Sequence, residues 1–114
     1  MYDPLVCGVH TISIHPTDLT DKGEHGNYTF GASPRIEVEA TLNPRETLQT
    51  LFHEFLHHFD EAYGLKLGES KVRTLEQLIL ASILDNPAFW KAIITEFTRR
   101  APTDEEEMFE PHAR

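Results

Sequence analysis

The spacing of apolar residues changes near Asn43, and this change constrains the fold more than any other feature. Before it, Arg35 to Thr41 alternates, as in a strand with one buried and one solvated face. The buried set is Ile36, Val38 and Ala40, and the solvated set is Glu37, Glu39 and Thr41. After it, an apolar stripe recurs at helical spacing: Leu48, Phe52, Phe55, Phe59 and Ala62. We therefore expect an α+β domain, with a small antiparallel or mixed sheet packed on a central helix.

The helices carry clear boundary signals. Asn43 can cap the first helix, Pro44 suits its first position, and Gly64 ends it. A second helix is expected from Glu69 or Ser70, with an apolar stripe of Val72, Leu75, Ile79 and Ile83, until Asp85-Asn86-Pro87 breaks it. A third helix should follow, with Phe89, Trp90, Ile93, Ile94 and Phe97, and should end near Arg100.

The first third of the chain predicts strands and turns. Val9 to His15 alternates partly, with Ile12 and Ile14 on one face. Asp18 to Asn27 is rich in loop-forming residues, and Tyr28 to Phe30 is a short strand candidate. We expect one domain over residues 1–102 and a solvated acidic tail over 103–114.

Charge and composition exclude several classes of protein. The 114 residues carry a formal net charge of −9, which argues against nucleic acid or an anionic membrane as the partner. No apolar run approaches the ~20 residues of a membrane span, and the N-terminus lacks a signal-peptide pattern. Cys7 is the single cysteine and is expected to be a small buried apolar residue. We expect a cytoplasmic protein.

The motif His53-Glu54-x-x-His57 lies in the middle of the first predicted helix. Residues four apart lie on the same side of a helix, so His53 and His57 can share one ion. Neutral imidazole nitrogens suit Zn²⁺, and we expect one zinc ion per chain. Glu54 lies beside the pair, where its carboxylate can take a proton from a water molecule as general base.

The remaining histidines and Asp60 carry weaker signals. His58 points about 100° away from His57 and is expected at the surface, although a substrate contact is an alternative. The other histidines lack ligand spacing and are expected in solvent: His10, His15, His25 and His112. Asp60 could either hydrogen-bond a ligand imidazole from outside the coordination shell or be plainly solvated.

A third protein ligand is expected from the second helix, because a catalytic zinc ion usually has three. Glu69 and Glu76 are seven residues apart and share a helical face. Glu76 interrupts an apolar stripe and therefore needs a partner, whereas Glu69 suits a helix N-terminus. The residues alone lean slightly to Glu76.

The motif resembles the zincin metallopeptidases of the gluzincin type, and more closely the small phage and mobile-element peptidases related to the ImmA/IrrE family. The resemblance covers about half of the chain, from Arg35 to Pro87. It rests on the strand Ile36 to Ala40, Thr47-Leu48-x-x-Leu51-x-His53-Glu54-x-Leu56-His57, Asp60, Tyr63-Gly64-Leu65, Leu67-x-Glu69-x-x-Val72-x-x-Leu75 and Asp85-Asn86-Pro87.

The resemblance implies a zinc-dependent peptidase acting on a protein or peptide. It implies Glu69 as the third ligand, with Glu76 as the alternative. It also implies that the strand before the motif helix lines the cleft and pairs with substrate along its edge. The residue that commonly follows the motif is small, and His58 departs from this.

Two other function classes stay open. One is a weak or inactive zincin-like module that acts through protein–protein binding, and the other is a purely helical interaction protein without metal. An active enzyme needs a group that stabilises the oxyanion, for which the candidates are Tyr63, Tyr28 and His58. A structural metal site would instead be closed by a fourth ligand, such as Asp60, His58 or both glutamates.

Overall fold

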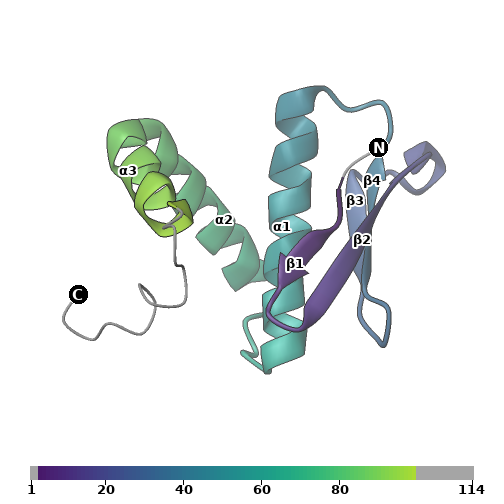
Figure 1. Ribbon diagram of the computed structural model, residues 1–114. Coiled ribbons are helices and arrows are strands. Elements are labelled where there is room, and N and C mark those ends of the chain that lie inside the picture. The colour runs from purple at the N-terminus through teal and green to yellow at the C-terminus, as the bar shows by residue number, and fades with distance from the viewer. Residues whose placement is uncertain (1–2, 100–114) are drawn as a thin grey trace. The chain divides into compact units, whose positions relative to one another are not determined.

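The structure is a computed structural model that describes residues 3–99. Its chain divides into two compact units, one ending at Leu78 and one beginning at Ile79. The first unit holds the whole sheet, helix α1 and the first turns of α2 (Figure 1). The predicted α+β class is confirmed, and a purely helical protein is excluded. The acidic tail and His112 lie outside the described residues.

The sheet has four strands in the order β1-β2-β4-β3. Their bounds are β1 Leu5–Cys7, β2 His10–Thr17, β3 Gly26–Thr29 and β4 Arg35–Glu39. β2 pairs with β4 in parallel, and the other two pairs are antiparallel. The sequence missed β1 and placed the start of β3 two residues late. A 3₁₀ turn, Thr20–Lys22, lies in the predicted loop.

The strand expected to offer its edge to substrate does not have a free edge. β4 directly precedes α1 but is internal, because it pairs with β2 on one side and β3 on the other. That expectation is wrong. Among the described strands, β3 and β1 are the two edges of the sheet.

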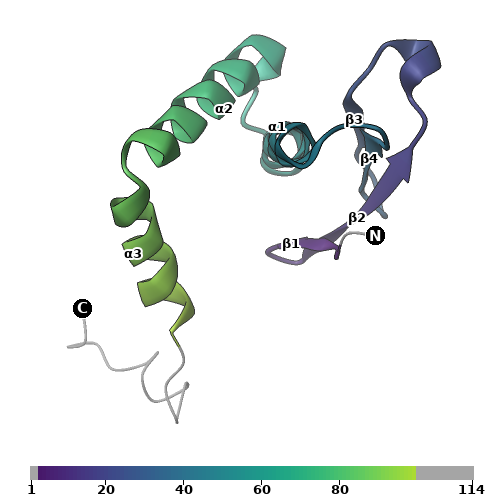
Figure 2. The ribbon, with the colours of Figure 1, turned by 90° about the horizontal axis from the view of Figure 1, so that it is seen from above.

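The core lies between the sheet and α1 (Pro44–Tyr63), whose end-on view against the sheet is seen in Figure 2. It contains Ile12, Ile14, Ile36, Val38 and Leu51. The buried face of α1 is Thr47, Leu51, Glu54 and His58, and it also takes in Leu56 at its border. The predicted stripe is offset from this face by one residue, or about 100°, and its Leu48 is 64% exposed.

β3 and α1 approach one another closely at Gly26. A Cβ on Gly26 would lie 2.5 Å from Thr50 Cγ2, so only glycine lets β3 lie this close to α1. The phenylalanines of the predicted stripe, Phe52, Phe55 and Phe59, are only half-buried, and Phe55 still packs against the core.

The expected solvated face of β4 is also wrong at Glu39. This residue is 5% exposed, whereas Ala40 is exposed. Its Oε1 accepts a hydrogen bond from Leu19 N at 2.6 Å. Its Oε2 accepts from Thr41 N at 3.0 Å and Thr41 Oγ1 at 2.6 Å. Three donors thus compensate for the loss of water around the carboxylate.

The boundaries of α1 are confirmed. Asn43 Oδ1 accepts from Glu46 N at 2.8 Å, and Glu46 Oε1 accepts from Asn43 N at 3.4 Å, which makes a capping box. Gly64 ends the helix in the left-handed conformation, with φ 61°. Helix α2 (Gly68–Asp85) then begins one residue before the predicted start.

The second unit contains the end of α2 and helix α3 (Pro87–Thr98). Within it, Trp90 Nε1 donates to Ser82 Oγ at 2.9 Å. Several apolar side chains of α3 are exposed: Phe89, Ile94 and Phe97. None of the helices in residues 3–99 is by itself long and apolar enough to cross a membrane, and only α2 and α3 taken together meet the length and composition required.

Candidate metal centre

The two motif histidines lie one turn apart on α1, beside its buried face. Their ring centroids are 4.8 Å apart, and the planes meet at 73°. Their side chains are 17% and 23% exposed, so solvent reaches both rings. The two rings lie on one side of α1 because residues four apart on a helix share a face.

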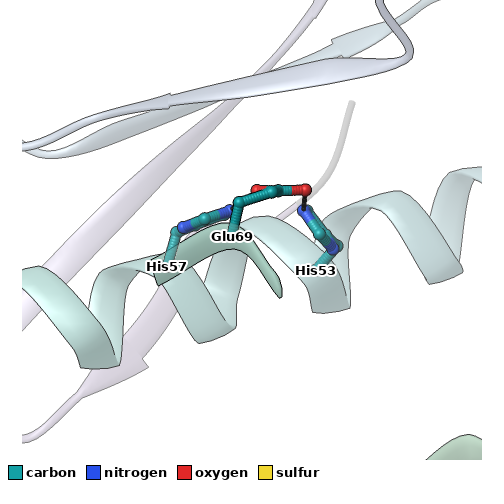
Figure 3. A group of neighbouring side chains, drawn as sticks. All are labelled: His53, His57 and Glu69. Carbon is teal, nitrogen blue, oxygen red and sulfur yellow. Dashed lines mark hydrogen bonds and ion pairs between the residues drawn. The ribbon is translucent and has the colours of Figure 1, made fainter. Parts of the chain in front are cut away.

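Glu69, at the first turn of α2, reaches both rings (Figure 3). Its Oε1 lies 2.7 Å from His57 Nε2, and its Oε2 lies 3.3 Å from His53 Nε2. Arg73 Nη2 donates to Oε2 at 2.6 Å from one turn further along α2. This hydrogen bond is the main reason why the pKa of Glu69 is lowered, so the carboxylate is ionised at neutral pH.

Glu76 contacts His53 on the other ring nitrogen from Glu69. It is 6% exposed, and its Oε1 lies 2.6 Å from His53 Nδ1. Gln49 Nε2 donates to its other oxygen at 2.8 Å. An Nδ1–H donated to Glu76 leaves Nε2 of His53 as a lone-pair donor on the side of Glu69. The partner that the sequence required for Glu76 is therefore His53.

The three residues His53, His57 and Glu69 suit one divalent cation. Each offers one ligand atom, and these atoms all lie within 4.8 Å of one another. Two imidazole nitrogens and one carboxylate oxygen form a donor set that zinc accepts. Glu76 fits the group as the carboxylate that orients His53 rather than as a ligand.

The proposed fourth ligands have other partners. Asp60 accepts hydrogen bonds from Leu67 N at 2.8 Å and Gly68 N at 3.1 Å, so it caps the start of α2. These bonds lower its pKa. His58 lies on the sheet side of α1. Within residues 3–99, neither side chain therefore joins the group of His53, His57 and Glu69.

A cleft of about 830 Å³ opens beside this group. It is formed by β3, α1 and the first turns of α2, all within the first unit. Gly26, Asn27 and Tyr28 line it from β3, opposite His53 and His57.

No family model, curated protein or solved structure significantly matches this chain.

Glu54 is buried at the wall of the cleft. It is 8% exposed, and within the described part of the chain no donor hydrogen-bonds to its carboxylate. Burial raises its pKa, while the neighbouring His53 and His57 act in the opposite direction. A carboxylate beside the two histidines is the type of group that general base catalysis uses.

Tyr28 and His58 bind one another. Tyr28 Oη lies 2.7 Å from His58 Nδ1, and burial, followed by the charge of Glu61, raises the pKa of Tyr28 to about 12. His58 is 0% exposed, so the predicted surface position is wrong. It packs on the sheet side because Leu51 and Glu54, one and two turns earlier, are buried there too. Burial lowers the pKa of His58, which keeps the ring neutral.

His10 and Tyr63 lie outside the set of residues that line the cleft. His10 was expected in solvent but is half-buried, and its ring lies 5.0 Å from that of His58. Tyr63 is 52% exposed, and its hydroxyl lies 4.0 Å from Cys7 Sγ, away from the residues that line the cleft. Cys7 is buried, as predicted. Neither a Tyr28–His58 pair nor a Glu76–His53 pair has a local sequence signal, because both join separate elements.

Proposed function

We propose that the chain is a zinc-dependent metallopeptidase of the zincin type, akin to the gluzincins and the small ImmA/IrrE-related peptidases. The observation that carries the proposal is the convergence of His53, His57 and Glu69 beside a buried, unpaired Glu54 at one cleft. These four side chains come from two helices, and each has the chemistry that metal-assisted hydrolysis needs.

The roles follow from the positions of the side chains. A zinc ion held by His53, His57 and Glu69 would polarise the substrate carbonyl and acidify a water molecule bound to it. Glu54 takes the proton from that water on its carboxylate and later returns it to the leaving amine. Glu76 holds His53 in the tautomer that presents Nε2.

Substrate would bind in extended form along β3. This strand is an edge of the sheet, and its residues Gly26 to Tyr28 line the cleft. Unpaired backbone groups on an edge strand can hydrogen-bond an added strand. The protein or peptide would then cross the cleft between β3 and α1, with one peptide bond next to Glu54.

The proposal includes a cytoplasmic setting and a protein substrate rather than nucleic acid or membrane. A buried free thiol at Cys7 suits a reducing compartment. The net charge of −9 disfavours polyanionic partners.

The test is proteolysis by zinc-loaded protein before and after Glu54→Gln. We expect the native chain to cut casein or proteins of a lysate, with new termini mapped by mass spectrometry, and Glu54→Gln to retain zinc but lose cleavage. The matched control is Glu37→Gln, on β4 and outside the cleft, which should cut normally. Equal cleavage by native protein and Glu54→Gln would contradict the proposal. Zinc binding without any cleavage would favour the inactive binding module.

A further inference from the structure

The residues that line the cleft carry more negative charge than a divalent cation and the nearby arginine would neutralise. Three further glutamates line it, all exposed: Glu24, Glu46 and Glu61. Arg73 is the only lysine or arginine among its lining residues, and it is already paired with Glu69. A divalent cation and Arg73 together offset three of the six glutamate charges, so three negative charges remain.

The extra glutamates lie toward both ends of the cleft. On α1, Glu46 precedes His53 by seven residues, or about 10 Å, and Glu61 follows His57 by four, or about 6 Å. β3 runs alongside, with Gly26 against Thr50 and Tyr28 against His58. Glu24, just before β3, therefore lies toward the Glu46 end.

A second observation points to an occupant of the same cleft. Glu54 is more than nine-tenths buried and has no hydrogen-bond donor within the described residues, yet it lines the cleft between the two acidic ends. Its oxygens are not among the fully enclosed atoms, so they reach the cleft, where an occupant can supply the missing donors.

We propose that the cleft selects peptides with lysine or arginine on both sides of the bond that is cut. An extended chain advances about 3.3 Å per residue, so the cations would lie about two residues from that bond on the Glu61 side. On the side of Glu46 and Glu24 they would lie about three residues away. The position of the cut bond rests on the proposed function, whereas the preference for cations rests on the cleft alone.

The experiment measures binding separately from cleavage. Two fluorescein-labelled nonapeptides, alternating Ala with Lys or Ala with Glu, are titrated by anisotropy with the Glu54→Gln protein, zinc-loaded and zinc-free. The Lys peptide should bind at least about tenfold more tightly than the Glu peptide in both forms, and raising the salt concentration should weaken it.

Charge removal locates the binding. Glu24→Gln/Glu61→Gln should weaken binding of the Lys peptide about fivefold, because each exposed charge contributes modestly. Asp85→Asn/Glu96→Gln removes the same charge from the second unit and should change nothing. Equal binding of both peptides, or equal loss in both double variants, would overturn the inference.

The two proposals can fail separately. A chain that binds no zinc but still prefers the Lys peptide loses the peptidase proposal and retains the cation-selective cleft. A zinc-loaded chain that cuts Lys and Glu peptides at equal rates retains the peptidase activity and loses the selectivity.

Discussion

Two buried glutamates, one at the end of β4 and one in the cleft, show how differently the same side chain is treated in this molecule. Glu39 and Glu54 are 5% and 8% exposed. Glu39 accepts hydrogen bonds from Thr41 and Leu19, and these bonds lower its pKa. Glu54 has no donor in the described residues, and burial raises its pKa.

The difference separates a residue that stabilises the fold from one available for chemistry. A fully hydrogen-bonded carboxylate holds the turn after β4 against Leu19, twenty residues earlier in the chain. A carboxylate buried without partners weakens the fold, and such groups concentrate at functional sites. Exposure alone would not have distinguished the two, whereas their hydrogen bonds do.

The largest expected effect comes from exchanging carboxylate for amide at the two positions. Glu54→Gln should lower kcat/KM by about 10²- to 10⁴-fold and leave the melting temperature equal or higher. Glu39→Gln should keep kcat/KM and lower the melting temperature, because an amide cannot accept all of the same hydrogen bonds. Peptide hydrolysis and thermal unfolding of both variants check this. If Glu39→Gln is fully folded but loses activity, the proposed difference between the two glutamates is wrong.

Glu76 sharpens the comparison, because it is buried and hydrogen-bonded yet contacts the site. Glu76→Gln should weaken zinc binding about 10- to 100-fold, since an amide holds the His53 ring in its tautomer less firmly. Competition with a zinc chelator measures the affinity, and Glu37→Gln is the control. An unchanged zinc affinity would mean that Glu76, like Glu39, only stabilises the fold.

Tyr28 tests the cost of an unpaired buried group on the sheet side of α1. Tyr28→Phe leaves His58 Nδ1 without its 2.7 Å partner and should destabilise the fold by about 1–3 kcal/mol. Tyr63→Phe, on a half-exposed side chain whose hydroxyl has only the 4.0 Å contact with Cys7 Sγ, should cost under about 0.5 kcal/mol. Urea unfolding of both variants gives the values. Equal effects would mean that the Tyr28–His58 bond does not stabilise the fold.

The smallest expected effect is a pH dependence. Because the pKa of Glu39 in the fold lies below its ordinary value of 4.5, ionised Glu39 adds stability above that value, and this is lost as the pH falls through the lowered pKa. Glu39→Gln should therefore differ most from the native chain near neutral pH and converge with it in acid. Urea titrations from pH 7 to pH 3 test this, and a constant difference across that range would contradict it.

Local signals predicted the parts of the fold that depend on neighbouring residues. The cap at Asn43, the stop at Gly64 and the buried Ile36 and Val38 were all predicted correctly. The aligned pair His53 and His57 follows from helix geometry alone.

Contacts between distant segments decided what the sequence did not predict. Gly26 lies against Thr50 of α1, a close contact that no local signal predicts. Leu19 donates to Glu39, which looked solvated in the sequence but is buried. Both glutamates of α2 contact His53: Glu69 lies at its Nε2 atom and Glu76 at its Nδ1 atom. Which glutamate meets which nitrogen depends on the angle between α1 and α2. No periodicity in the chain encodes that angle.

Zinc content tests the central proposal most directly. Native protein and a His53→Ala/His57→Ala variant, shown to be folded by circular dichroism, are loaded with excess zinc, dialysed and measured by mass spectrometry of the metal. We predict about one zinc ion per native chain and almost none in the variant. Equal zinc in the two proteins, or no bound zinc in the native chain, would contradict the account.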